Sequence, residues 1–291
     1  MVETARHLDV KDQAARAAAD AAARAGVRVE ELHDMPAIED AARLFTSIWS
    51  VAPDEPPISS HLMKAMAHTG NYVSGAYADG RLIGAIVGMF GSTNGSLELH
   101  SHILGVDPLV QNRSVGFALK LHQRAWALER GIHTMTWTFD PLVRRNAYFN
   151  LTKLGAGLRE YHENFYGAMD DTFNAGDESD RVLVAWHLDS DRAVEASLGR
   201  HLILNDDPNT GTSSVAALRP DASDEPVIET VEAPRLLAWI PNNIVTLRSA
   251  DPDRALRWRR ALREVLGPAM ADGYTAEGMT RSGWLVLHRS A

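Results

Sequence analysis

The hydrophobic and polar positions change period along the chain, which predicts a mixture of helices and strands. Residues 10–25 are rich in alanine with charged residues between them, which is typical of an amphipathic helix of high propensity. Apolar stripes with helical spacing also predict helices at residues 34–49, after Pro57, and at 115–129, 145–154 and 251–271. Period-two or short apolar segments predict strands at residues 27–32, 72–77, 82–90, 97–106, 133–139, 181–188, 236–240 and 284–288.

One hairpin stands out in this pattern. Two strands flank Ala78-Asp79-Gly80-Arg81, and an Asp-Gly pair suits a tight turn whose central residues have positive φ. The order of elements up to residue 129 is therefore strand, two helices, three strands and a helix. This order predicts an α+β fold with a mixed sheet.

Composition along the chain suggests where domains meet. Residues 205–228 are dense in Asp, Pro, Ser, Thr and Gly, which favours a mobile linker or a long surface loop. We therefore expect a helical extension at 1–26, a main domain at 27–204, the linker, and a small α/β subdomain at 229–291. The subdomain repeats the strand-helix-strand-strand order of residues 137–186, so it is either a half-repeat or a common arrangement that occurs twice.

Charge and composition exclude some classes of site and binding partner. The 291 residues include no cysteine and carry a net charge of −9. This excludes disulfides and thiolate sites, and it argues against a nucleic-acid surface, which needs clustered Lys and Arg. No apolar run reaches the roughly 18 residues of a membrane span. The expectation is a cytoplasmic protein with no membrane or nucleic-acid partner, in which the first helix packs within the chain or forms a homodimer contact.

The segment with the clearest chemistry runs from Gly105 to Ala118, a strand followed by a turn and a helix. A helix N-terminus presents free backbone N–H groups and a partial positive charge, and Arg113 adds a full charge. Gly116 would let the backbone approach a ligand closely. These features suit a pyrophosphate, although an ordinary strand-to-helix connection with a serine at the helix start has the same spacing.

Gln111-x-x-Ser114-x-Gly116 resembles the pyrophosphate loop of the GNAT acyltransferase superfamily, with Ser114 in place of a glycine. The order of elements over residues 27–188 is also similar to that of the family. The stretch from residue 133 to 156 further resembles a poorly characterised bacterial subgroup of predicted GNAT acyltransferases. The resemblance implies a GNAT-like acyl-CoA-binding fold, with the subdomain as a C-terminal extension.

The resemblance also implies where the co-substrate lies. Acetyl-CoA or another acyl-CoA, without a metal, would occupy a V between strands 97–106 and 133–139. Backbone groups of Leu104 and Val106 would pair with pantetheine. Amides of the loop would hold the pyrophosphate, and two asparagines would either bind pantetheine amides or solvate their helix. These cofactor-binding candidates are Leu104, Val106, Gln111, Asn112, Arg113, Ser114, Val115, Gly116, Phe117, Asn146 and Asn150.

Three polar residues share one face of strand 97–106 by its period of two: Glu98, His100 and His102. His100 falls where many GNAT enzymes carry a catalytic glutamate, so it could act as general base, with Glu98 orienting it. The alternatives are histidines hydrogen-bonded within the sheet, or a metal site. Ligands on one face of a flat strand lie roughly 7 Å apart, which does not favour a metal.

The candidate for the general acid does not lie at the position where the GNAT family carries it. Where the family carries a tyrosine that protonates the leaving thiolate, this sequence has Leu151. Tyr148 lies one turn earlier on nearly the same helical face and is the replacement candidate, with packing as its other role.

Two functions remain open at this point. The first is an N-acyltransferase that moves an acetyl or succinyl-type group to a small amine, such as an amino acid. The second keeps the fold without transfer to an amine: an acyl-CoA-binding regulatory protein, or an acyl-CoA-modifying enzyme such as a decarboxylase.

Overall fold

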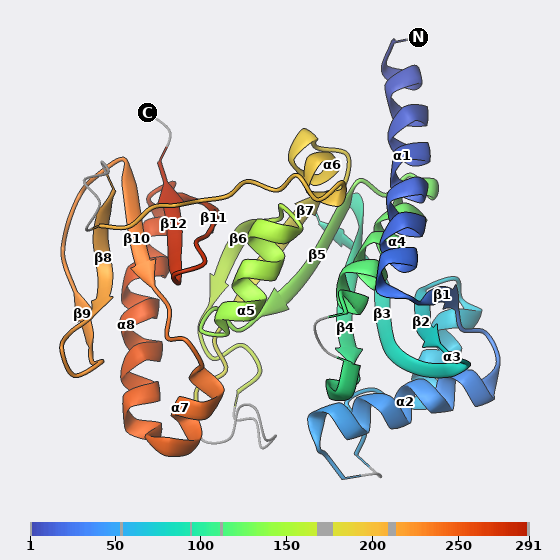
Figure 1. Ribbon diagram of the computed structural model, residues 1–291, viewed down its shortest axis with the longest axis horizontal. Helices are drawn as coiled ribbons and strands as arrows, with labels where there is room; N and C mark the ends of the chain where they lie inside the picture. Colours follow the sequence, from blue (N-terminus) through green and yellow to red (C-terminus); the bar gives the residue numbers. More distant parts are fainter. Residues whose placement is uncertain are drawn as a thin grey trace. The chain divides into compact units, whose positions relative to one another are not determined.

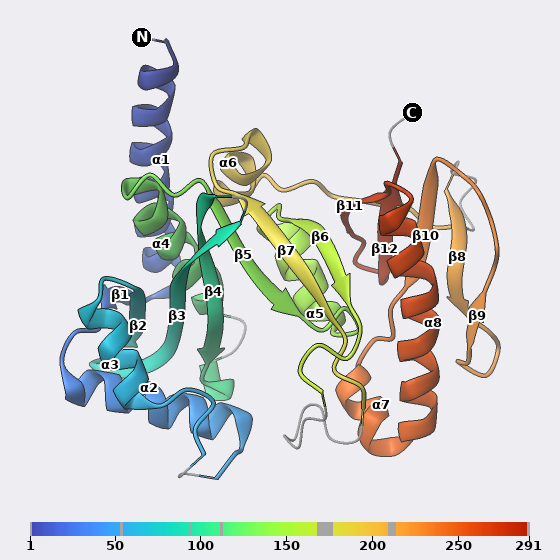
Figure 2. The same ribbon diagram turned by 180° about the vertical axis from the view of Figure 1, so that it is seen from behind.

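A computed structural model describes residues 2–52, 55–93, 95–110, 113–167, 177–208 and 214–289, with residues 2–8 described by their backbone alone. The chain forms two compact units (Figures 1 and 2). Unit 1 comprises Met1–Trp137 and His187–Leu198, and unit 2 comprises Thr138–Trp186 and Gly199–Ala291. Two strands pass from one unit to the other along the chain, β5 (Thr134–Phe139) and β7 (Arg181–His187).

Unit 1 is built on a sheet with strands in the order β1-β2-β3-β4-β5, antiparallel except for the parallel pair β4–β5. Its other elements are α1 (Val2–Ala25), β1 (Arg28–Glu31), α2 (Met35–Trp49), α3 (Ser60–His68), β2 (Tyr72–Ala78), β3 (Arg81–Thr93), β4 (Ser96–Val106), a 3-10 helix (Pro108–Val110), α4 (Val115–Glu129) and α6 (Asp191–Ser197). The predicted order of strand, two helices, three strands and helix is confirmed from β1 to α4, and the predicted strand at 133–139 is β5; α6 was not predicted.

The two faces of this sheet are covered by different helices. Helices α2 and α3 pack on one face around Phe45, Met63 and Val87. Helix α4 packs on β2, β3 and β4, and α1 lies along α4. Alanines of α1, including Ala14 and Ala21, are buried against the rest of the unit, so the first helix packs within the chain, as one of its two predicted roles requires.

The predicted hairpin is confirmed. Asp79 (φ 50°) and Gly80 (φ 74°) both have positive φ, as expected for the centre of a tight hairpin turn between β2 and β3. Asp34 begins α2 as predicted, since its side chain accepts a hydrogen bond from the N–H of Ala37 at 2.9 Å.

Strand β4 contains a bulge. Val87 of β3 lies opposite Ile103, but the next residue, Gly88, lies opposite Ser101, so His102 is an extra residue in β4. On its other side, β4 pairs with β5 through Leu99 opposite Met135 and His100 opposite Thr136. In the described part of unit 1 this parallel register ends at His100.

Unit 2 contains a second sheet in the order β11-β12-β10-β8-β9, in which β8 and β10 are parallel. Strand β6 pairs antiparallel with β7. The elements of this unit are α5 (Arg144–Ala147), a π-helix (Tyr148–Lys153), β6 (Gly157–His162), β8 (Val215–Pro220), β9 (Pro226–Ile228), β10 (Arg235–Trp239), α7 (Ile244–Ala250), α8 (Pro252–Ala271), β11 (Thr275–Met279) and β12 (Trp284–His288).

Three expectations for this part of the chain are corrected. The predicted linker at 205–228 contains β8 and all of β9, because the small apolar run Val215–Leu218 pairs with β10. The predicted helix at 145–154 is a single α-helical turn followed by a π-helix, and α7 was not predicted. The boundaries between the two units also do not coincide with the predicted boundary at 205–228.

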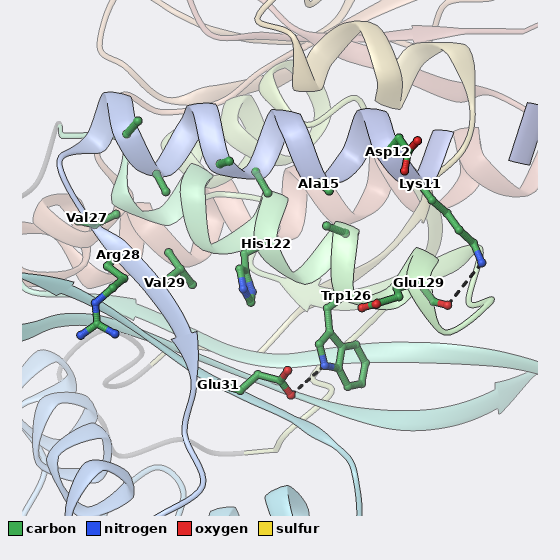
Figure 3. Close-up of a pocket in the computed structure, with 15 residues that line it drawn as sticks. Lys11, Asp12, Ala15, Val27, Arg28, Val29, Glu31, His122, Trp126 and Glu129 are labelled. Atoms are coloured by element: carbon green, nitrogen blue, oxygen red, sulfur yellow. Dashed lines mark hydrogen bonds between the residues drawn. The ribbon is translucent and has the colours of Figure 1, made fainter. Parts of the chain in front are cut away.

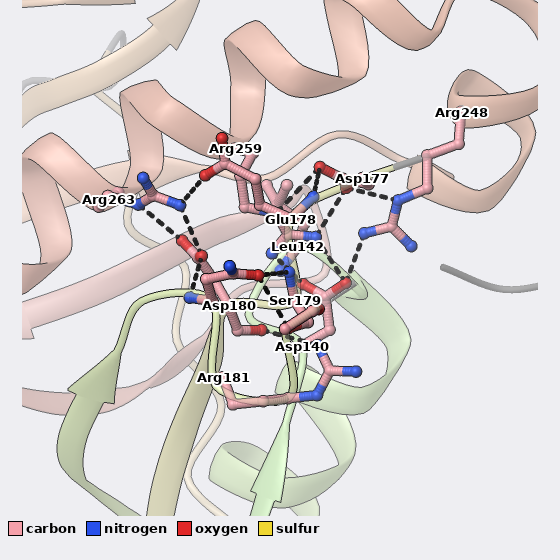
Figure 4. A network of polar contacts seen from close by, with 12 residues as sticks. Asp140, Leu142, Asp177, Glu178, Ser179, Asp180, Arg181, Arg248, Arg259 and Arg263 are labelled. Carbon is pink, nitrogen blue, oxygen red and sulfur yellow. Dashed lines mark hydrogen bonds and ion pairs between the residues drawn. The ribbon is translucent and has the colours of Figure 1, made fainter. Parts of the chain in front are cut away.

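Buried ion pairs explain why residues before and after the predicted boundary belong to one unit (Figure 4). The guanidinium of Arg259 donates to both carboxylate oxygens of Asp140, at 2.7 and 2.8 Å, and to Asp177 at 2.9 Å. Arg248 pairs with the same two carboxylates. Burial alone would raise the pKa of Asp140, but Arg259 and then Arg248 hold it well below its ordinary value.

No helix in the described ranges combines the length and the apolar character needed to cross a lipid bilayer.

Candidate functional site

The connection between β4 and α4 is ordered around Asp107. Its carboxylate accepts the N–H of Leu109 at 2.9 Å and pairs with Arg81 at 3.3 Å, while its own N–H donates to the carbonyl of Ile83. These bonds fix the direction in which the chain leaves β4. The predicted loop residues Gln111 and Asn112 lie outside the described residues.

Helix α4 begins without a side-chain cap. Ser114 has left-handed backbone angles (φ 61°, ψ 20°), and its side chain makes no capping hydrogen bond. In contrast, Asp34, Ser59 and Asp251 each accept a backbone N–H at the start of their helices. The first N–H groups of α4, on Val115, Gly116 and Phe117, have no acceptor within the helix. This end therefore offers several donors and a partial positive charge to an anionic group.

Gly116 is not required by the packing of the protein. A Cβ placed on it would lie 3.6 Å from Leu104 and 3.8 Å from Val106, which are ordinary contact distances. Among the described residues, a side chain at position 116 would therefore fit without displacing a neighbour. The charge of Arg113 lies close to the end of α1, since a Cβ on Gly26 would be 3.0 Å from its Nη2.

His100 lies at the end of the β4–β5 register. Its Nδ1 is 3.2 Å from Oγ1 of Thr136, the residue opposite it on β5. Burial, followed by the nearby His102 and Lys120, lowers the pKa of His100 below its ordinary value, and Glu98 opposes that shift. The imidazole is therefore neutral near pH 7, which is the form that accepts a proton.

The other two polar residues of this strand are arranged differently. Glu98 accepts a hydrogen bond from Oγ1 of Thr93 at 2.9 Å. His102 is exposed at the bulge, with its ring centroid 6.4 Å from that of His100. In the parts of the chain that the structure describes, no cluster of three or more His, Cys, Asp or Glu is arranged to hold a metal ion.

A buried lysine that the sequence did not single out lies behind His100. Nζ of Lys120 donates to Oγ of Ser101 at 2.8 Å and lies 3.7 Å from the ring centroid of Trp137. Burial lowers the pKa of Lys120 to about 7. Its position between Leu119 and Leu121 looks like part of a mixed helix surface, so the sequence alone carried no signal for it.

Three predicted residues belong to unit 2. Asn146 is partly buried and its N–H donates to the carbonyl of Val143 at 2.8 Å. Tyr148 is partly buried and starts the π-helix, in which Asn150 and Leu151 are buried. The roles expected for Asn146, Tyr148 and Asn150 stay predictions.

A pocket of about 710 Å³ lies in unit 1 beside α1, α4 and β1 (Figure 3). Alanines of α1 form one side, and His122 and Trp126 of α4 form another. Nδ1 of His122 is 2.7 Å from the hydroxyl of Tyr72, and Trp126 donates to Glu31 at 2.9 Å. His122 and Trp126 are thus partnered within the protein, and none of the predicted site residues lines the pocket.

Several solved structures are similar to this chain. The chain matches an acetyltransferase of the GNAT family from Streptococcus pneumoniae (14% identity, TM-score 0.45, 55% of this chain and 98% of that chain). It matches the ribosomal-protein-S18-alanine N-acetyltransferase from Escherichia coli (16% identity, TM-score 0.44, 56% and 94%). The chain is similar in structure to GNAT acetyltransferases.

A third solved structure with this similarity is an aminoglycoside acetyltransferase from an uncultured soil metagenomic sample, in complex with trehalose (21% identity, TM-score 0.37, 40% of this chain and 80% of that chain). No family model and no curated protein matches the chain. At these identities and TM-scores the likeness to GNAT proteins concerns the fold and identifies no substrate.

Proposed function

We propose that the protein is an acyl-CoA-dependent N-acyltransferase that moves an acetyl or succinyl-type group to a small amine, such as an amino acid. The observation that carries the proposal is the uncapped N-terminus of α4, which follows β4 after a 3-10 helix, together with His100 at the end of the β4–β5 register. The proposed anion site and the proposed proton acceptor thus belong to one unit.

The residues present suit a CoA thioester. The free N–H groups of Val115, Gly116 and Phe117 are donors of the kind that bind phosphate oxygens, and Gly116 leaves room for them. A bound acyl-CoA would supply an activated acyl group for attack by an amine. Backbone groups of Leu104 and Val106 are the proposed contacts for pantetheine.

His100 is the proposed general base. An amine substrate is mostly protonated at neutral pH, and it must lose a proton before or during attack on a thioester. The neutral imidazole of His100 can accept that proton, and Thr136 holds one of its ring nitrogens. We propose His102, exposed at the bulge, as a group that contacts the acceptor amine or relays its proton.

The reaction is tested by thioester consumption with and without a pool of amino acids and small amines. Acetyl-CoA and succinyl-CoA are offered separately, and products are identified by mass spectrometry. We expect consumption that depends on an amine, and we expect His100→Ala to lower kcat by about 100-fold with little change in CoA affinity. His61→Ala, at an exposed position of α3, is the matched control and should behave as the parent protein.

The second candidate, a CoA-binding regulator or an acyl-CoA-modifying enzyme such as a decarboxylase, is favoured by one observation. Leu151, at the position where the resemblance expects a tyrosine acid, is apolar and buried at 1% exposure. The same assay separates the candidates, because a modifying enzyme consumes acyl-CoA without any amine and a regulator does not consume it. Equal activity of His100→Ala and the parent protein would remove His100 from the mechanism.

A further inference from the structure

The divergence of β4 from β5 is held by contacts on both faces of the sheet. We call the four residues involved the fork: His100 and Ser101 on β4, and Thr136 and Trp137 on β5. Because successive residues of a strand point to opposite faces, His100 and Thr136 lie on one face, and Ser101 and Trp137 lie on the other. The first pair is joined by a contact of 3.2 Å, and the second pair is joined through Lys120.

Lys120 reaches the fork from α4. Its Nζ donates to Ser101 on β4 at 2.8 Å and lies 3.7 Å from the ring centroid of Trp137 on β5, so one ammonium group contacts both strands immediately after their register ends. The hydroxyl of Ser101 in turn donates to Oε1 of Gln123, one turn further along α4. This chain of contacts fixes Ser101, the residue after His100.

The ammonium group is buried without a compensating carboxylate in the ranges that the structure describes. Lys120 is 4% exposed, and its pKa is lowered by burial. A buried cation without an anion is costly, and groups with strongly perturbed pKa values cluster at functional sites. By contrast, the buried guanidinium groups of Arg248 and Arg259 in unit 2 each pair with two aspartates.

We propose that Lys120 is a positioning residue for His100: it anchors the fork and keeps the imidazole of His100 in its neutral, proton-accepting form. The catalytic meaning of this inference rests on the proposed function, whereas the coupling of the two residues does not. Lys120 acts through the sheet and through Ser101 and has no direct contact with a substrate in this role.

The groups around His100 determine the direction in which Lys120 shifts its pKa. Burial lowers its pKa most, His102 of β4 and Lys120 of α4 lower it further, and Glu98 of β4 raises it. Lys120 is protonated below pH 7, where histidines titrate, since its own pKa is about 7. Loss of the ammonium charge therefore makes the imidazolium form of His100 easier to reach and raises its pKa.

The test is an NMR titration of the full-length protein labelled with ¹³C-histidine, in which the His100 signal is identified by its loss in His100→Gln. We expect Lys120→Met to raise the measured pKa of His100 by about 0.5, and Lys120→Arg, which keeps the charge, to leave it low. In the transfer assay, the acidic limb of kcat/KM should move to higher pH in Lys120→Met by the same amount.

These readouts separate the two proposals. A shift of His100 in the titration together with an absence of any transfer activity would support the coupling and contradict the proposed function. An unchanged His100 titration in folded Lys120→Met would overturn the coupling, whatever the activity. Lys120→Gln is the second neutral variant, because it can still donate to Ser101. If neither neutral variant folds, Lys120 has a structural role and the proposal is overturned.

Discussion

Each unit contains one parallel pair of strands, and the chain leaves the two pairs in different ways. In unit 1 the chain passes from β4 into α4, whose N-terminus has no side-chain cap. In unit 2 it passes from β8 through a turn into β9, and Asp221 closes that turn by accepting the N–H groups of Ser223 and Glu225. The N–H groups at the start of α4 are the proposed donors to a ligand, whereas the N–H groups of Ser223 and Glu225 after β8 are used by the protein.

The start of helix α8 in unit 2 extends the contrast. The carboxylate of Asp251 accepts the N–H of Arg254 at 3.0 Å at the start of α8, and Asp253 adds a further negative charge in the first turn. A second carboxylate near the end of a helix dipole disfavours an anionic ligand. A parallel pair of strands alone therefore does not distinguish the two units; the proposed anion site rests on the uncapped start of α4.

Buried cations are also treated differently in the two units. In unit 2, Arg248 and Arg259 pair with aspartates, whereas in unit 1 Lys120 contacts Ser101 and Trp137. We expect substitution of Arg248 or Arg259 to affect stability, and substitution of Lys120 to affect proton transfer and binding.

The largest expected effect is at Arg259. Arg259→Met should destabilise the protein by about 3–5 kcal/mol, because it leaves the buried carboxylates of Asp140 and Asp177 without their main partner. The measurement is chemical denaturation followed by circular dichroism. Arg257→Met on the same helix removes an exposed pair with Glu225 and should change the midpoint little. Equal effects of the two variants would contradict the importance assigned to the buried network.

The next effect concerns the anion site of unit 1. Gly116→Glu should weaken CoA binding by about 100-fold, or about 2.7 kcal/mol, because it places a carboxylate among the proposed phosphate donors. Isothermal titration calorimetry with CoA measures this effect, and circular dichroism checks the fold. Gly267→Glu in α8, where a Cβ meets open space, is the control and should bind CoA normally. Retained affinity in Gly116→Glu would place the CoA site elsewhere.

Much of unit 1 could be predicted from the sequence because its signals are local. Asp79-Gly80 fixed the hairpin, Asp34 marked a helix start, and the apolar stripe gave the bounds of α4. The partners of Lys120 could not be predicted in this way. Its contacts come from a strand 19 residues earlier and from Trp137 on another strand, and only the folded sheet brings them together.

In unit 2 composition was misleading for the same reason. The polar stretch around β8 looked like a linker, yet Ala216 and Leu218 are buried once β10 lies beside them. Likewise, nothing near Asp140 in the sequence indicates Arg259, since the two residues are 119 positions apart. Long-range contacts of this kind, both ion pairs and strand pairing, join distant segments in unit 2, and they leave no periodic signal.

The smallest expected effect concerns Ser114, whose Cβ could crowd a bound phosphate or whose hydroxyl could donate to it. A residue with a side chain in the left-handed region costs roughly 1–2 kcal/mol relative to glycine, and the greater freedom of glycine in the unfolded chain offsets part of this. Because the Ser114 side chain makes no capping bond, Ser114→Gly should change the free energy of unfolding by about 1 kcal/mol or less, in the stabilising direction. It should also bind CoA at least as tightly as the parent protein.

The comparison variant is Ser114→Ala, which keeps the Cβ and removes the hydroxyl. If crowding by the Cβ limits the approach of phosphate, calorimetry will show tighter binding for Ser114→Gly, by about threefold, and no change for Ser114→Ala. If both variants bind CoA more weakly, the hydroxyl donates to the ligand, and the serine is then a functional replacement for the glycine of the GNAT loop. In that case the Ser114 hydroxyl, together with the first N–H groups of α4, would bind the anion, which would explain why the hydroxyl does not cap the helix.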